Sequence, residues 1–172
     1  MVDVPLQDRM EMMDVIARYS YLCDEGRADE VAELFTPDGV LDATIDGIPG
    51  KFAPSGHTKE FVGRDGMRKH LVGGAPEVFG RPGTKQMHMQ TNLIFDEFSE
   101  NSARTRNYLL WTASMSPPKV RDDQGPLILS HGYYIDTWER YEGRWRFKYR
   151  NYRPAGYHPI YHDEHAKLPK PE

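Results

Sequence analysis

YSYLCDEG, residues 19–26, closes the first helical pattern of the chain and separates it from a second one. The segment places a carboxylate, two phenols and a thiol directly before Gly26, and glycine commonly ends a helix. The second helical pattern begins at Arg27. Because an unpaired charge is costly to bury, a carboxylate on an apolar helix face must be paired or neutral. We therefore expect Asp24 to have a partner in another part of the chain.

The composition indicates a single domain. A chain of 172 residues, of which 38% are hydrophobic, can bury one core but not two large ones. We expect one domain over residues 1–172, with a core at about 6–153 and an irregular tail at 154–172.

Charge and hydropathy argue against two kinds of partner. The net charge of −4 comes without a dense cluster of Lys and Arg, so a nucleic-acid footprint is missing. Every apolar run is far shorter than the roughly 20 residues of a membrane-spanning helix, so we expect no membrane partner. The chain has one cysteine, and its N-terminus lacks the charged and apolar regions of a signal peptide. These features predict a cytoplasmic protein.

The first helix is predicted from its apolar periodicity. It begins at Leu6 and stops at Gly26, and its apolar residues recur at spacings of three and four. The apolar face is expected to consist of Leu6, Met10, Met13, Ala17 and Tyr21.

The segments that follow mix helix and strand signals. A second helix is expected at 28–35, and Pro and Gly then indicate a turn at 36–39. A loosely alternating strand follows at 40–45, and Asp46-Gly47 is a hairpin signal. A third, shorter helix is expected at 60–72.

The second half of the chain alternates with period two. The pattern predicts four strands, at 85–95, 102–115, 127–141 and 144–153. Turns at 99–101 and 142–143 and a long loop at 116–126 would join them into an antiparallel meander. Helices followed by a run of strands favour an α+β domain, with the helices on one side of a curved sheet.

Alternation along these strands assigns candidate residues to a pocket. His88, Gln90 and Asn92 share one face of their strand. The corresponding faces of the other strands are expected to carry Tyr108, Leu110, Thr112 and Ser114, then His131, Tyr133, Ile135 and Thr137, and finally Trp145, Phe147, Tyr149, Asn151 and Arg153. Arg146, Lys148 and Arg150 are expected to point the other way. If the first set of faces meets under the first helix, it forms a half-apolar pocket typical of a small-molecule site.

Several segments together resemble the SnoaL-like branch of the nuclear transport factor two-like family. The segments are 19–24, 34–39, 61–66, 88–92, 132–138 and 143–147. The resemblance spans about residues 6–153. It implies a curved antiparallel sheet that forms a cone-shaped α+β barrel, closed by the N-terminal helices around a deep pocket. Members of the family include scytalone dehydratase, bile-acid 7α-dehydratase, hexachlorocyclohexane dehydrochlorinase, ketosteroid isomerase, polyketide cyclases and small subunits of ring-hydroxylating dioxygenases.

The resemblance also implies catalytic roles. In the lyases of this family an aspartate near the end of the first helix pairs with a histidine on a strand, which corresponds to Asp24 and His88 here. Tyr19 matches a catalytic tyrosine, and Arg153 falls near a catalytic arginine. Helix geometry offers Tyr21 as the alternative to Tyr19, because a spacing of three residues places Tyr21 closer to the helix face of Asp24.

Further residues are expected to contact the substrate. They are Tyr21, Asn92, Tyr108, Trp111, His131 and Tyr133. His131 could replace the second histidine that scytalone dehydratase carries one strand earlier.

Other chemistries lack support in the sequence. His158, His162, Asp163 and His165 have metal-like spacing but lie in a tail without a rigid scaffold, so we expect no metal. Cys23 is expected to be a small buried hydrophobe rather than a nucleophile. No phosphate-binding glycine loop or serine elbow is present, so we expect no cofactor.

The leading functional hypothesis is a cofactor-independent lyase of the dehydratase type, acting on an aromatic, polyketide-like or steroid-like substrate. Within the same class, the base could instead trigger C–C cleavage that releases a small aldehyde. Two alternatives stay open: a small subunit of a ring-hydroxylating dioxygenase or a ligand-binding module, and an isomerase or cyclase with the same base. Large apolar residues around Trp111 and Trp138 further suggest a homo-oligomer, a dimer or trimer.

Overall fold

The computed structural model describes residues 2–42, 60–73, 84–115 and 127–157. The helices and strands are, in chain order, α1 (Leu6–Asp24), α2 (Ala28–Glu33), β1 (Phe35–Asp42), β2 (Glu60–Val62), α3 (Gly63–Gly73), β3 (Thr84–Phe98), β4 (Ser102–Met115), β5 (Leu127–Tyr141) and β6 (Arg144–Tyr157). The predicted hairpin signal at 46–47, the loop at 116–126 and the histidines of the tail lie outside the described residues. None of the helices in the described ranges is long and apolar enough to cross a membrane.

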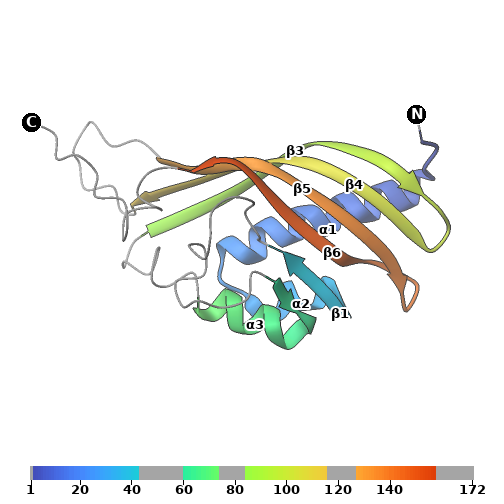
Figure 1. The fold of residues 1–172 in the computed structure, drawn as a ribbon, viewed down its shortest axis with the longest axis horizontal. Helices are drawn as coiled ribbons and strands as arrows, with labels where there is room; N and C mark the ends of the chain where they lie inside the picture. Colours follow the sequence, from blue (N-terminus) through green and yellow to red (C-terminus); the bar gives the residue numbers. More distant parts are fainter. Residues whose placement is uncertain (1, 43–59, 74–83, 116–126, 158–172) are drawn as a thin grey trace, which may run out of the picture.

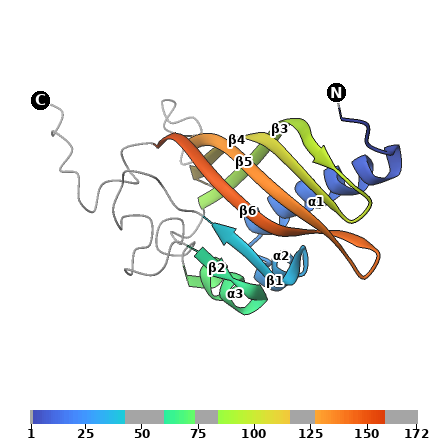
Figure 2. The same cartoon turned by 45° about the vertical axis from the view of Figure 1, so that its right-hand side comes forward.

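All six strands form one curved, unclosed sheet in the order β2-β1-β6-β5-β4-β3. The long strands β3 to β6 arch over one side of α1, while α2, α3 and the short strands lie beside its C-terminal half (Figures 1 and 2). The predicted α+β class is confirmed. The sheet is mixed rather than wholly antiparallel, because β1 runs parallel to β6.

The strand predictions are the most accurate. β4 and β5 begin and end at the predicted residues, and β3 extends a little beyond the predicted strand at both ends. β6 continues to Tyr157, so the irregular tail begins later than residue 154. Glu142 and Gly143 have φ values of 50° and 75°, as expected for a tight hairpin turn.

The predicted apolar face of α1 is wrong. Leu6, Met10, Met13 and Tyr21 are 47–73% exposed. The helix instead buries a neighbouring stripe that contains Met12, Val15, Ile16, Tyr19, Leu22 and Cys23. Both stripes are apolar at helical spacing, and contact with the sheet decides between them. The Tyr19 ring, for example, packs edge-on against Phe35, Tyr134 and Phe147.

The predicted turn at 36–39 is also wrong, because these residues belong to β1. α2 ends at Glu33, and the amide of Phe147 donates to the carbonyl of Leu34 at 3.0 Å, which starts the parallel pairing with β6. A register shift between Phe35 and Val40 accommodates the Pro and Gly of this segment. A Cβ on Gly39 would lie 3.0 Å from the carbonyl oxygen of Phe147, so glycine permits this close approach.

A second irregularity changes which side chains of β6 face α1. Phe147 pairs with Trp138, but Tyr149 pairs with Thr137, so Lys148 is an extra residue. Beyond this bulge Arg150 is buried, in contrast to the sequence prediction.

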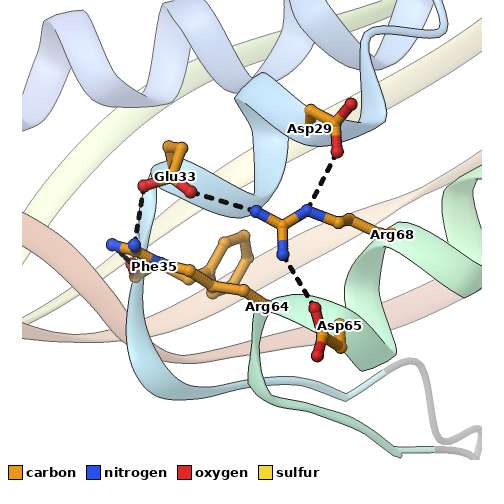
Figure 3. A network of polar contacts seen from close by, with 6 residues as sticks. All are labelled: Asp29, Glu33, Phe35, Arg64, Asp65 and Arg68. Carbon is orange, nitrogen blue, oxygen red and sulfur yellow. Dashed lines mark hydrogen bonds and ion pairs between the residues drawn. The ribbon is translucent and has the colours of Figure 1, made fainter.

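The third helix is shorter than predicted, since 60–62 form the strand β2 and α3 begins at Gly63. Two arginines of α3 attach it to α2 and β1 (Figure 3). Arg64 pairs with Glu33 at 2.6 Å and donates two hydrogen bonds to the carbonyl of Phe35, at 3.0 and 3.2 Å. Arg68 contacts Asp29, Glu33 and Asp65 at 2.8–3.1 Å.

Candidate active site

Asp24 and His88 lie in direct contact at the C-terminal end of α1. Oδ1 of Asp24 lies 2.5 Å from Nδ1 of His88, and Oδ2 accepts the backbone N–H of His88 at 2.9 Å. β3 is an edge strand, so this N–H has no neighbouring strand to bond. One carboxylate thus holds both the ring and its backbone. Because a carboxylate only accepts, Nδ1 carries the hydrogen of this contact, and in the neutral imidazole the lone pair is then on Nε2.

Trp111 forms a flat wall beside the histidine. It lies opposite His88 in the β3–β4 pair, and the two rings stack with centroids 4.9 Å apart and planes 20° from parallel. The side chains of His88 and Asp24 are 11% and 18% exposed, so the pair is largely shielded from water. Of the predicted substrate contacts, Trp111 is the one that the structure places next to the pair.

A chain of amide side chains leads from His88 toward the interior. Gln90, two residues further along β3, donates from Nε2 to the hydroxyl of Ser20 on α1 at 2.7 Å. Its Oε1 accepts from Nδ2 of Asn107 at 2.9 Å and also from Arg150. Gln90 therefore links α1, β3, β4 and β6 at a point adjacent to the pair.

Arg150 is fully buried in the centre of this network. Its guanidinium lies 4.1 Å from the ring centroid of Tyr19, 3.7 Å from that of Tyr134 and 4.4 Å from that of Phe147. Nε lies 3.5 Å from Oδ1 of Asp136, and both side chains are 0% exposed. Burial raises the pKa of Asp136 to about 7, although the charge of Arg150 opposes the shift.

Several buried polar atoms in this cluster lack a hydrogen-bond partner among the described residues. They are both carboxylate oxygens of Asp136, Nε and Nη1 of Arg150, and Oδ1 of Asn107. Most buried polar atoms in proteins are paired, and an unpaired one costs about 1–3 kcal/mol. We therefore include this cluster, which sequence reasoning missed, in the candidate site.

Tyr19 and Tyr21 lie in different environments. Tyr19 is 4% exposed and points into the cluster, whereas Tyr21 is 71% exposed. Burial raises the pKa of Tyr19 well above its ordinary value, so its phenol stays protonated at neutral pH. Burial also raises the pKa of Cys23 to about 12, which agrees with the prediction of an inert buried thiol.

The structure does not bring the remaining predicted residues to His88. Tyr108, His131, Tyr133 and Arg153 alternate with inward residues and lie on the sheet face away from α1. Asn92 is exposed, with φ of 58° at a register shift of β3. The bulge at Lys148 explains why Arg153 lies on the outer face, because it exchanges the faces of the residues that follow it. A signal for the missed residues exists in β5, where Tyr134, Asp136 and Trp138 place a carboxylate between aromatic residues on one face.

Comparisons with known proteins agree with this architecture. A family model described as a SnoaL-like domain matches residues 4–151. A comparison with curated protein sequences gives no match.

Solved structures share the fold. A protein from Novosphingobium aromaticivorans, provisionally named a scytalone dehydratase, is 25% identical with a TM-score of 0.65 over 89% of each chain. An NTF2-like protein with a cystatin-like fold from the same organism is 20% identical, with a TM-score of 0.66 over 87% of this chain and 83% of that one. A third protein from that organism, provisionally named an aromatic ring hydroxylase, is 20% identical, with a TM-score of 0.66 over 90% and 93%.

Proposed function

The chain belongs to the SnoaL-like domain family, and on that premise we propose that it is a cofactor-independent lyase in which His88 is the catalytic base. Members of this family are commonly enzymes. The observation that carries the proposal is the double contact of Asp24 with the ring and the backbone of His88. This contact fixes the position and tautomer of the imidazole, as a general base requires.

The proposed reaction is an elimination of water. Nε2 of His88 takes a proton from a carbon next to an activating group, and the C–H electron pair forms the new double bond. The bond from the neighbouring carbon to its hydroxyl group breaks, and the hydroxyl leaves as water with the proton that Nε2 of His88 took, which the imidazolium returns to it. Asp24 stabilises the imidazolium that forms. If the base removes a hydroxyl proton instead, the same geometry supports C–C cleavage with release of a small aldehyde.

Tyr19 and Arg150 are the proposed partners of the base. Tyr19 can donate a hydrogen bond, and Arg150 supplies positive charge behind it, 4.1 Å from its ring. Together they can stabilise negative charge that develops on a substrate oxygen. Arg150 takes the place in this proposal that the sequence analysis gave to Arg153 or His131.

The site favours a flat, partly apolar substrate. Trp111 offers an aromatic wall, and the ring of Tyr134 lies further in. Gly132 sits at a buried, inward position of β5, opposite Leu109, and a glycine within a strand commonly marks a close approach of a ligand or of another backbone. An aromatic, polyketide-like or steroid-like compound with a hydroxyl leaving group fits these features.

The test compares wild type with His88→Ala in a thermal-shift screen of hydroxylated aromatics, polyketides and steroids, followed by mass spectrometry of each stabilising compound. We expect wild type to convert a hit with loss of water or formaldehyde. His88→Ala should bind the same compound but react about two to four powers of ten more slowly. The matched control is His131→Ala, which removes an exposed histidine from the opposite face and should keep wild-type activity. Equal rates in wild type and His88→Ala would refute the proposal.

Two alternatives would give a different result in the same screen. A small dioxygenase subunit or a binding module would bind compounds without converting them, and the former would co-purify with a large iron–sulfur subunit. The fold shared with the provisionally named aromatic ring hydroxylase is compatible with this alternative. An isomerase or cyclase would convert a compound without loss of mass, and His88→Ala would again be inactive.

We also propose that the protein is a cytoplasmic homo-oligomer. The residues named in the sequence analysis do not support self-association, since Trp138 is fully buried and Trp111 stacks on His88. Other residues do, because the sheet face away from α1 exposes a patch at neighbouring positions of β3, β4 and β5. The patch consists of Met87, Met89, Tyr108, Ile128 and Tyr133. Exposed apolar patches of this kind commonly mark interfaces.

A further inference from the structure

A cavity of about 520 Å³ lies on the sheet face away from α1, toward the turn between β3 and β4. Neither Asp24 nor His88 lines it. Its lining comes from that turn and from β4, β5 and β6, and it includes the outward side chains of Arg104, Ile135, Tyr149, Asn151 and Arg153, together with Glu97. Its volume is in the range of small-molecule sites, about 300–1,000 Å³.

One buried side chain in the lining offers a hydrogen-bond acceptor. Asn151 is 3% exposed, and its Nδ2 donates to the carboxylate of Asp42, which also accepts from the hydroxyl of Tyr149. This fixes the orientation of the amide. Oδ1 of Asn151 has no hydrogen-bond partner among the described residues. A ligand hydroxyl could satisfy it, and a buried acceptor without such a donor is unfavourable.

Two guanidinium groups contribute positive charge from separate strands. Arg104 comes from β4 and Arg153 from β6, and the cavity contains one acidic residue, Glu97. Glu97 lies 3.6 Å from Arg104, but its side chain is 71% exposed and that of Arg104 is 50% exposed. Exposed pairs of this kind contribute little stability, so a ligand anion can compete for the arginine.

Apolar surface completes the lining. Ile135 pairs with Asn151 across the two strands, and Tyr149 pairs with Thr137, so the apolar side chains alternate with the polar ones along this face. Phe98 also borders the cavity at the hairpin turn, but its ring packs against Trp145 of the core. A flat ring therefore has apolar contacts within reach of both the acceptor and the arginines.

We propose that this cavity is a second ligand site, which takes a small aromatic carboxylate that also bears a hydroxyl group. The carboxylate binds Arg104 and Arg153, the ring lies against Ile135 and Tyr149, and the hydroxyl donates to Oδ1 of Asn151. The site is independent of the reaction at His88, because the sheet separates the two.

Calorimetric titration of the full chain with 4-hydroxybenzoate tests the proposal. We expect saturable binding that weakens with added salt, because two charge contacts hold the ligand. 4-Hydroxybenzyl alcohol, which lacks the carboxylate, should bind at least about tenfold more weakly, since one charge-assisted contact is worth about 1.5 kcal/mol or more. Arg153→Gln should weaken 4-hydroxybenzoate by a similar factor, and Ile135→Trp should fill the cavity and abolish binding.

Two further variants distinguish this site from the one at His88. His88→Ala should bind 4-hydroxybenzoate as wild type does, and Gly132→Val, which adds a side chain on the α1 side, should also leave the affinity unchanged. The proposal is overturned if wild type does not bind, or if binding survives in both Arg153→Gln and Ile135→Trp.

Discussion

Arginines in two regions of the molecule have opposite environments. Arg150 is fully buried in the site, where two of its nitrogens have no hydrogen-bond partner among the described residues. Arg68, between α3 and α2, directs its three nitrogens at three carboxylates, and Arg64 contacts Glu33 and a backbone carbonyl (Figure 3). Of Arg68 and Arg150, the guanidinium with a partner for every nitrogen is thus the one that water reaches.

This difference separates stability from function. Exposed ion pairs replace contacts with water and are each worth about 0–1 kcal/mol, even with good geometry. A buried pair with unmatched donors is expensive to keep, and apolar residues of similar size would commonly be as stable or more so. Binding of a ligand, as in the proposed function, would explain why Arg150 and Asp136 are kept, whereas Arg64 and Arg68 attach α3 to α2 and β1.

Replacement of Arg150 is expected to have the largest effect on stability. Arg150→Met should lower the free energy of unfolding by about 3–5 kcal/mol, because it leaves the carboxyl group of Asp136 buried without its counter-charge. Urea denaturation followed by circular dichroism measures the change. The double variant Arg150→Met/Asp136→Leu removes both charges and should recover most of the loss. A loss below about 1 kcal/mol in the single variant would contradict the importance of the buried charge.

The stability of the fold should depend on pH through Asp136. Its pKa rises from 3.8 to about 7 on folding, so the folded state holds this proton more tightly than the unfolded state. The resulting stabilisation is complete below the unfolded pKa and is lost as the pH rises through about 7. Between about pH 4 and about pH 7 the loss is on the order of 3 kcal/mol. Asp136→Asn should lack this component, which urea denaturation of both proteins across the pH range would show.

Asp38 provides a control of opposite sign for this pH series. Hydrogen bonds from Lys148 and then from Thr36 hold the pKa of this exposed carboxyl group below its ordinary value. Its stabilisation is present above the ordinary pKa and is lost as the pH falls through the lowered value. Asp38→Asn should therefore differ from wild type in the pH dependence only at acidic pH. If Asp136→Asn behaved in the same way, the assignment of Asp136 would be wrong.

Replacement of Arg64 is expected to have an intermediate effect on the free energy of unfolding. Its side chain is 23% exposed, and it donates two hydrogen bonds to the carbonyl of Phe35, a residue that is fully buried at the start of β1. Arg64→Ala should lower the free energy of unfolding by about 1–2 kcal/mol, since a charged donor is lost from a partly buried carbonyl. Urea denaturation measures this change in the free energy of unfolding. Arg64→Lys keeps the charge without the two-pronged geometry and should recover only part of the loss.

Features of the fold that depend on local sequence patterns could be predicted, and features that depend on contacts between distant segments could not. Period-two alternation gave the four long strands, because one face of each lies against the core along its length. The alternation failed at Lys148, where one extra residue in β6 reverses the faces of the residues that follow, up to the next register shift after Pro154. The turn at 36–39 failed for a similar reason, since Pro37 and Gly39 are tolerated in β1 only through its irregular pairing with β6.

The residues of the candidate site also divide into those that could be predicted from the sequence and those that could not. Asp24 could be identified because a carboxylate near the end of an apolar helix needs a partner, and the family resemblance indicated His88. Arg150 and Asp136 could not be combined from sequence, because their contact depends on the bulge and on the pairing of β5 with β6. The remaining wrong prediction is the buried face of α1. The helix has two apolar stripes at helical spacing, and the sequence does not show which one contacts the sheet.

Arg68 should show the smallest effect, although it makes three ion pairs. Its side chain is 33% exposed, and those of Asp29 and Asp65 are both 89% exposed, so water and salt reach every partner. Arg68→Ala should lower the free energy of unfolding by no more than about 1 kcal/mol, and added salt of about 0.5 M should reduce this further. The effect of Arg150→Met should not change with salt, because its charges are fully buried. An effect of Arg68→Ala as large as that of Arg64→Ala, or one that resists salt, would mean that the network acts as a single cooperative unit. In that case the number of contacts, and not burial, would determine what an arginine contributes here.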